Sequence, residues 1–303
     1  MAMFRLEATI LSREKRGKSV IAAAAYRAGT KLKDERNGNV YDYSRRVKGV
    51  VDTTILAPEG APGWAHDSGR LWNAVEAGEK RVDAQLARQF ILAVPPELSV
   101  EAQFATARDW AQKELVGRGM IAEVSLHHSR TGRNPHVHIL CTMRRLDGEK
   151  FSARKPREWN DVGLLRQQRE SWAAAVNAAL EAAGRPERVD HRSLKDQGVD
   201  RIPEPKRGIE ATAMERRGAV EDTRRSEEIR HVKLLNDVRP MAKAIRKGGE
   251  VKQHGMGKTW WEKSIVFVGR LHQRAGHWLK KGWRKLVDSG RAKGESSEPH
   301  LER

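Results

Sequence analysis

The sequence has little cysteine, few aromatic residues and no long hydrophobic run. Its 303 residues include one cysteine, Cys141, so no disulfide can form within the chain and a reducing compartment is expected. No apolar stretch reaches the roughly 18 residues of a membrane span, and the N-terminus lacks the apolar core of a signal peptide. These absences predict a protein made and kept in the cytoplasm.

A nucleotide-hydrolysis motif is also missing, whereas positive charge is abundant. No Gly-x-x-x-x-Gly-Lys occurs, so a P-loop motor is not expected. Lysine and arginine total 58 against 40 aspartate and glutamate, which gives a net charge of +18. Such an excess indicates a polyanionic partner, either nucleic acid or an anionic membrane surface.

The most informative stretch is 123–140, where four histidines fall within twelve residues. Its alternating apolar residues predict a hairpin, with His127 and His128 at the end of one strand and His136 and His138 at the start of the next. Side chains at i and i+2 of a strand share a face, so the latter two can reach one ion, with His127 or His128 as third ligand. Three neutral imidazoles suit a divalent transition metal and leave a position open for a substrate oxygen.

A second informative stretch is 20–28, which contains four consecutive alanines and predicts a helix. Ser19 is a suitable N-cap and Gly29 a suitable stop. Tyr26 lies in this helix with Arg27 beside it. Taken alone, the stretch favours an ordinary amphipathic packing residue over a nucleophile for Tyr26.

The order of expected elements indicates an α+β fold with a mainly antiparallel sheet, and by itself it favours helices on one face. Asn37-Gly38 predicts a tight turn. Strands are expected at 3–11, 50–56, 89–94 and twice within 123–140, and helices at 20–28, 68–87, 99–117 and 160–183.

Residues 216–303 differ in composition and predict a basic, mainly helical C-terminal extension with a disordered tail from Ser289. Residues 215–242 are highly charged and expected to be helical. Residues 260–286 form a basic amphipathic helix candidate rich in tryptophan. It could pack on the first domain, dock a partner, lie on an anionic membrane surface or stack on single-stranded DNA.

Four stretches together resemble the MobA/MobL family of plasmid mobilisation relaxases, a branch of the HUH endonucleases. The likeness covers roughly residues 1–215, which we take as the first domain. The tyrosine stretch and the Asn-Pro-His-x-His motif are specific in combination. The stretches are Ser19–Gly29, Leu71–Arg88, Asn134–His138 and Asp190–Pro203.

The resemblance implies an HUH relaxase fold, with helices packed on the faces of an antiparallel sheet. It also implies an enzyme that nicks one strand of plasmid DNA at the origin of transfer, keeps the 5′ end as a phosphotyrosine and later rejoins the strand. Tyr26 falls on the nucleophile position, and His136 and His138 fall on two metal positions. Mg²⁺ or Mn²⁺ is the expected ion, with Zn²⁺ as the alternative.

The remaining site residues follow from the same comparison and from strand phase. His127 is preferred as third ligand, with His128 as the alternative. Glu123 would share the face of His127 and orient its imidazole. Glu76, in a Trp-Asn-x-x-Glu context, is the acidic candidate for the catalytic site. The family often has Arg-Glu where this chain has Arg88-Gln89, which puts an acidic role there in doubt.

The expected partner is plasmid DNA at the origin of transfer, single-stranded or supercoiled. Accessory mobilisation proteins and a type IV coupling protein are further expected partners, and the protein could travel with the DNA into the recipient cell. The alternatives are an HUH-type replication initiator or transposase and a non-catalytic, metal-stabilised DNA-binding protein. The expected DNA-contacting residues are Lys18, Arg27, Arg133 and Arg144.

Overall fold

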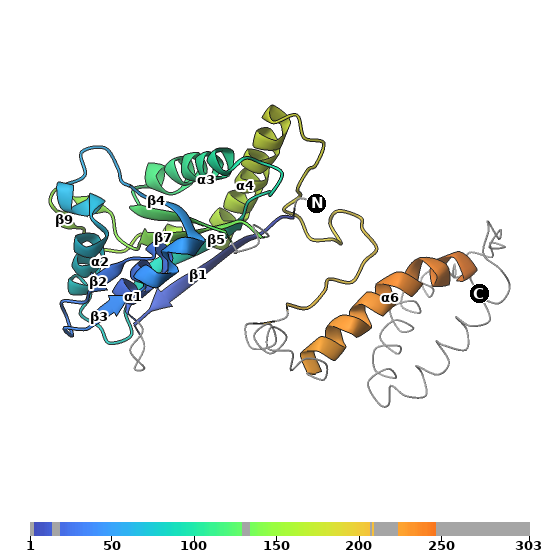
Figure 1. Cartoon of the computed structure of the whole chain (residues 1–303), viewed down its shortest axis with the longest axis horizontal. Coiled ribbons are helices and arrows are strands. Elements are labelled where there is room, and N and C mark those ends of the chain that lie inside the picture. The colour runs from blue at the N-terminus through green and yellow to red at the C-terminus, as the bar shows by residue number, and fades with distance from the viewer. Residues whose placement is uncertain (1–2, 14–18, 129–133, 207, 209–223, 247–303) are drawn as a thin grey trace, which may run out of the picture. The chain divides into compact units, whose positions relative to one another are not determined.

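The structure is a computed structural model that describes residues 3–13, 19–128, 134–206, 208 and 224–246 (Figure 1). The chain divides into two units, Met1–Val199 and Asp200–Arg303. The domain boundary predicted at 215 lies outside the described residues and stays a prediction. The amphipathic helix at 260–286 and the tail from Ser289 also lie outside them.

A five-stranded antiparallel sheet forms the centre of the first unit, in the strand order β1-β5-β7-β6-β4 (Figure 1). The predicted α+β class with an antiparallel sheet is therefore confirmed. The predicted hairpin is β6 and β7, and its register places His127 opposite His136. The strands are β1 (Leu6–Ser12), β4 (Val50–Leu56), β5 (Gln85–Ala93), β6 (Ala122–His127) and β7 (His136–Thr142).

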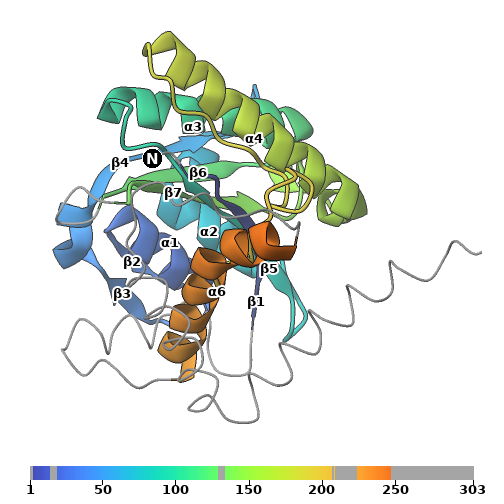
Figure 2. The ribbon, with the colours of Figure 1, turned by 90° about the vertical axis from the view of Figure 1, so that its right-hand side faces the viewer.

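Helices cover both faces of this sheet (Figure 2), so the expectation of helices on one face is wrong. The long helices α3 (Val100–Glu114) and α4 (Val162–Ala182) pack on one face. On the other face lie α1 (Val20–Ala28) and α2 (Ser68–Ala77). The reason is that the central strands bury apolar side chains in both directions, so that each face needs a covering layer.

Short elements complete the first unit. The Asn37-Gly38 turn joins β2 (Lys31–Lys33) to β3 (Val40–Asp42) as predicted, with Gly38 at φ +75°. Strands β8 (Leu146–Asp147) and β9 (Lys150–Phe151) form a second small hairpin. The 3-10 helices are η1 (Ser44–Gly49), η2 (Gly63–His66), η3 (Val116–Arg118) and η4 (Arg157–Asn160).

Helix α2 is much shorter than predicted, because it ends at Ala77 instead of residue 87. The Arg13 guanidinium donates hydrogen bonds to the carbonyls of Glu76, Glu79 and Arg81 and thereby fixes the chain in a turn after the helix. Strand β5 then starts at Gln85, four residues before the predicted start. Two apolar residues extended the helix in the prediction: Leu86 is a buried residue of β5, whereas Val82 is exposed in the turn.

The second unit contains α6 (Arg224–Arg246), which confirms a helix in the described part of the charged 215–242 segment. The Ile202 backbone N–H donates to Asn236 Oδ1 at 2.8 Å, and Asn236 Nδ2 donates to the Ile202 carbonyl at 2.9 Å. Arg239 forms an ion pair with Asp200 at 2.7 Å. Within the residues that the structure describes, no helix combines the length and apolarity needed to cross a bilayer.

Candidate metal centre and nucleophile

Three histidines from the β6–β7 hairpin meet on the α1 side of the sheet. His127, His136 and His138 each offer a ring nitrogen, and these nitrogens lie within 4.8 Å of one another. The ring centroids are 4.8, 5.0 and 5.6 Å apart. The sequence prediction that these residues share a face is confirmed, and the arrangement has the ligand type and spacing for one metal ion.

The first imidazole is oriented by the last turn of α1. The final carbonyls of a helix lack a partner inside the helix, and Arg27 O is one of them. His127 Nε2 lies 2.6 Å from this carbonyl, so Nε2 must carry the proton and donate it. Nδ1 of His127 is then the unprotonated nitrogen. The same bond fastens the histidine strand to the helix that bears Tyr26.

The second imidazole is oriented by the Asn-Pro-His motif itself. Asn134 has φ +64°, a left-handed conformation that asparagine tolerates better than most residues. This conformation directs Asn134 O towards His136, whose Nδ1 lies 3.0 Å away and donates to it. The unprotonated nitrogen of His136 is therefore Nε2. Backbone carbonyls that fix the tautomers of histidines are a common feature of metal sites.

The third imidazole has an unsatisfied polar atom. His138 Nδ1 is buried and has no hydrogen-bond partner among the described residues. Burial, together with the neighbouring His127 and His136, lowers the pKa of His138 to about 3. Burial also lowers the pKa values of His127 and His136. Neutral imidazoles and an orphaned buried nitrogen fit a bound divalent cation, because metal ligands must be unprotonated.

The alternative third ligand, His128, is placed elsewhere. Its Nε2 contacts Gln103 Oε1 at 2.8 Å, on the side of helix α3. Its backbone N–H donates to Gly49 O. Because successive residues of a strand point to opposite faces, His128 cannot share the face of the other three histidines. The structure therefore groups His127, and not His128, with His136 and His138.

The predicted nucleophile stands at the exposed surface of α1 beside this cluster. Tyr26 is 36% exposed. Its ring meets Tyr43 edge to face at 5.4 Å between centroids, and the Arg46 guanidinium lies 4.0 Å from its ring centre. The reason that Tyr26 is exposed in a helix of small residues is that the alanines, and not the phenol, pack against α2 and the sheet.

Arg27 links the nucleophile helix to the sheet. Its guanidinium donates to Ala23 O at 2.6 Å and to Gln89 Oε1 on β5. Burial lowers its pKa, while Glu123 and Tyr26 act in the opposite direction, so both groups are electrostatic neighbours of this cation. Its Nε is buried without a partner among the described residues. Gln89 thus supplies a neutral acceptor to the Arg27 guanidinium.

Glu123 shares the histidine face of β6 but is fully buried under α2. Trp72 Nε1 donates to its Oε2 at 2.5 Å, and Ser68 is a second polar neighbour of the carboxyl group. Burial raises the pKa of this carboxyl group. The rings of His127 and His136 donate hydrogen bonds to backbone carbonyls, so an orienting role for Glu123 stays a prediction.

Glu76 is brought together with two arginines and not with the histidines. Its side chain is 1% exposed, and Oε1 lies 2.9 Å from Arg13 Nε and 2.7 Å from Arg36 Nε. Arg13 is itself buried and makes the carbonyl contacts that end α2. This network joins β1, α2 and the β2–β3 hairpin. A catalytic role for Glu76 stays a prediction.

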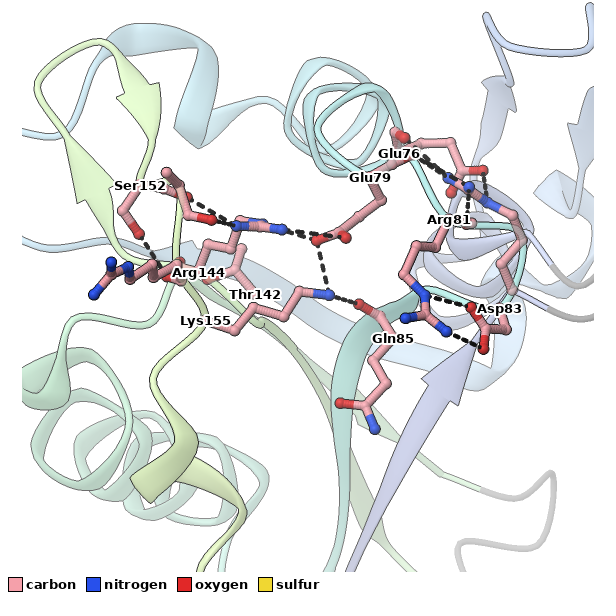
Figure 3. A network of polar contacts seen from close by, with 12 residues as sticks. Glu76, Glu79, Arg81, Asp83, Gln85, Thr142, Arg144, Ser152 and Lys155 are labelled. Atoms are coloured by element: carbon pink, nitrogen blue, oxygen red, sulfur yellow. Dashed lines mark hydrogen bonds and ion pairs between the residues drawn. The ribbon is translucent and has the colours of Figure 1, made fainter.

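Arg144, expected to contact DNA, is engaged within the protein (Figure 3). Its guanidinium binds both oxygens of Glu79, at 2.8 and 3.3 Å, and the carbonyls of Ser152 and Ala153. Lys155 adds a 2.8 Å contact to Glu79. Burial alone would raise the pKa of Glu79, but the hydrogen bonds from Arg144 and Lys155 outweigh it and hold the pKa below its usual value.

Two other predicted DNA contacts, Lys18 and Arg133, lie outside the described residues. Conversely, the sequence interpretation missed Tyr43 and Arg46 as neighbours of Tyr26. The one available signal was the run of cations that directly follows Tyr43, a combination typical of nucleic-acid contacts.

Comparisons with known proteins show the family of the chain. The MobA/MobL family profile matches residues 18–217. The mobilization protein MobL of Acidithiobacillus ferridurans is 34% identical over 257 residues, which is 74% of this chain and 67% of that protein. The conjugal transfer protein TraA of Agrobacterium fabrum is 34% identical over 254 residues, and the match spans 74% of this chain but only 23% of TraA.

One solved structure has the same fold. It comes from work on the molecular basis of vancomycin resistance transfer in Staphylococcus aureus. Its sequence is 30% identical, its TM-score is 0.59, and the match covers 63% of this chain and 100% of that one.

Proposed function

The chain belongs to the MobA/MobL family, and we propose that it is a DNA relaxase that nicks one strand of plasmid DNA at an origin of transfer and later rejoins it. The observation that carries this proposal is the contact between the histidine cluster and the helix of Tyr26. His127 donates to the carbonyl of the residue that follows Tyr26, so the proposed nucleophile and the proposed metal site are neighbours through one hydrogen bond.

The proposed reaction is a transesterification. The Tyr26 hydroxyl loses its proton to solvent and attacks the scissile phosphorus. A bond forms between the phenolic oxygen and phosphorus, the bond from phosphorus to the 3′ oxygen breaks, and that oxygen takes up a proton. The 5′ end of the cut strand remains joined to the protein as a phosphotyrosine. The new ester bond to Tyr26 thus replaces the broken ester bond to the 3′ oxygen. Attack by a 3′ hydroxyl reverses the step and rejoins a strand.

His127, His136 and His138 are the proposed metal ligands. When bound, a divalent ion supplies Lewis-acid stabilisation of the negative charge that develops on the phosphate oxygens. The imidazoles are neutral, so the ion would keep its full charge for the phosphate. Mg²⁺ prefers oxygen ligands, so three imidazoles favour a transition metal, and we propose Mn²⁺ as the first ion to test.

The other site residues contribute by position. Arg27, held by Gln89, fixes the last turn of α1, and Glu123 is an electrostatic neighbour of this cation. We propose that this arrangement keeps Tyr26 aligned with the metal site. The reaction places the protein in the bacterial cytoplasm, with origin DNA as substrate and with accessory mobilisation and coupling proteins as further partners.

The test is covalent adduct formation on single-stranded origin DNA with Mn²⁺. Wild type should give a protein–DNA adduct that resists denaturation, and Tyr26→Phe should give none. Tyr43→Phe is the matched control, because Tyr43 packs on the same ring and yet should retain adduct formation. DNA binding by wild type without any adduct on a set of origins would favour a non-catalytic DNA-binding protein instead.

A further inference from the structure

We propose that η1 (Ser44–Gly49) is a binding site for the phosphates of single-stranded DNA beside Tyr26, and that Arg45, Arg46 and Lys48 make the contacts. The identity of this polyanion rests on the proposed function. The phosphates bound here would be those next to the scissile one. This assigns a substrate-binding role to an element that the sequence patterns left without one.

The first reason is position. A Cβ atom on Gly29, the residue that ends α1, would lie 3.1 Å from both Val47 Cα and Val50 Cγ2, so η1 packs directly on the end of the nucleophile helix. Gly29 has φ +63°, which further restricts the position to glycine. At its other end, η1 continues into β4, whose residue Val50 pairs with His127. The element therefore spans from the Tyr26 helix to the metal candidates.

The second reason is unpaired charge. Arg45, Arg46 and Lys48 are all exposed, and within the described part of the chain none forms a salt bridge, although Arg45 is an electrostatic neighbour of the Asp42 carboxylate. The nearby Asp42 carboxylate is held by Ser44, through its backbone N–H at 3.0 Å and its hydroxyl at 2.7 Å. Three neighbouring cations repel one another, and binding of an anionic backbone relieves that repulsion.

The third reason is the aromatic pair between these cations and α1. Arg46 lies over the face of Tyr26, and Tyr43 meets the same ring edge to face. Cations interleaved with partly exposed aromatic rings are the combination that tracks single-stranded nucleic acid. Arg46 would therefore be both a phosphate contact and a positioning residue for the Tyr26 ring.

Three other arginines of the first unit differ from the η1 cations, because their guanidinium groups are hydrogen-bonded within the protein. Arg13, Arg27 and Arg144 have donors committed to buried carboxylates, amides or carbonyls of the protein itself. Using them for DNA would require breaking those bonds. The cations of η1 need no such rearrangement, so they are the better suited set for binding phosphates.

The experiment measures the salt dependence of DNA binding by the full-length chain in a Tyr26→Phe background. A fluorescent oligothymidylate is titrated by anisotropy over a range of salt concentrations. Each phosphate contact contributes roughly 0.7 to the slope of log affinity against log salt for single strands. The triple variant Arg45→Gln, Arg46→Gln, Lys48→Gln should therefore lower the slope by about 2.

A matched control removes three exposed cations from the opposite side of the sheet. Arg108 and Lys113 on α3 and Arg166 on α4 are exposed, and their change to glutamine alters net charge equally. This control should keep the wild-type slope. A second variant, Arg45→Lys with Arg46→Lys, retains three charges and should also keep it. Thermal melts compare the folding of all variants.

An η1 triple variant with an unchanged slope, or a control variant with an equal drop, overturns the proposal. The readout needs no cleavage, so it is independent of adduct formation. If wild type forms no adduct but the η1 triple variant lowers the salt slope, the relaxase function alone is contradicted. A protein that forms the adduct and binds DNA equally well without the η1 charges would contradict this inference alone.

Discussion

Loss of the Arg13 side chain should destabilise the first unit strongly. The Arg13 and Glu76 side chains are 8% and 1% exposed, and their charged atoms lie 2.9 Å apart. Arg13→Met would leave the Glu76 carboxylate buried with Arg36 as its only cation, and would release the carbonyls that end α2. Removing one partner of a buried ion pair costs about 3–5 kcal/mol.

The size of the effect can be compared with a neighbouring variant. Arg36 binds the same carboxylate oxygen, but its side chain is 47% exposed. Solvent screens the exposed Arg36 end of this pair, and Arg13 remains as a buried partner of Glu76, so Arg36→Met should cost about 1 kcal/mol. For a unit of this size, each kcal/mol shifts the melting temperature by about 2–4 °C. Arg13→Met should therefore lower it by roughly 6–20 °C, and Arg36→Met by less than about 4 °C.

Thermal unfolding followed by circular dichroism measures both shifts. Equal shifts for the two variants, or an Arg13→Met shift below about 2 °C, would refute the reasoning that burial makes this network strong. A third variant, Glu76→Gln, tests whether Glu76 has a catalytic role. If Glu76 acts by holding α2, Glu76→Gln should lose stability and keep adduct formation below its melting temperature. A stable Glu76→Gln variant that forms no adduct would show direct participation in the chemistry.

Three further predictions concern the histidines and the cysteine. His127→Ala should weaken Mn²⁺ binding by more than about 100-fold, which exceeds the loss typical of residues that only orient a ligand. His128→Ala should leave Mn²⁺ binding nearly unchanged. Calorimetric titration measures both affinities, and equal losses would contradict the assignment of His127 as the third ligand. The folded pKa of His138, about 3, lies below the unfolded value of about 6.5. Between these two pKa values the unfolded chain binds one more proton at His138 than the folded protein does. The metal-free protein should therefore have its full stability above about pH 6.5 and lose stability as pH falls towards 3. His138→Gln should flatten this dependence, as urea titrations at a series of pH values would show. Cys141 should not react with a thiol reagent until the protein unfolds, because burial raises the pKa of its thiol, and rapid labelling of native protein would contradict this.

Features encoded by short spacings could be predicted from the sequence. The His-x-His pair, the turn before it and the histidine across the turn predicted the histidine cluster, because strand alternation fixes which side chains share a face. The alanine-rich run with its serine cap and glycine stop gave helix α1, but the same run favoured a packed Tyr26, whereas the structure exposes it. The antiparallel sheet followed from the hairpin and the order of elements.

Features that depend on distant partners could not be predicted. The end of α2 is set by Arg13, more than sixty residues earlier, and local periodicity carries no trace of that contact. Arg144 reads as a free surface cation until the structure brings Glu79 to it across 65 residues. The placement of Arg46 over Tyr26 likewise needs the close approach of η1 to Gly29.

The central claim is that Tyr26 is the residue that becomes joined to DNA, and the most direct measurement is the identity of the modified residue. Wild-type protein is incubated with single-stranded origin DNA and Mn²⁺, the adduct is digested with protease and nuclease, and the nucleotide-bearing peptide is sequenced by mass spectrometry. The structure predicts a phosphate ester on Tyr26. An ester on Tyr41 or Tyr43, the other two tyrosines of the chain, would contradict it.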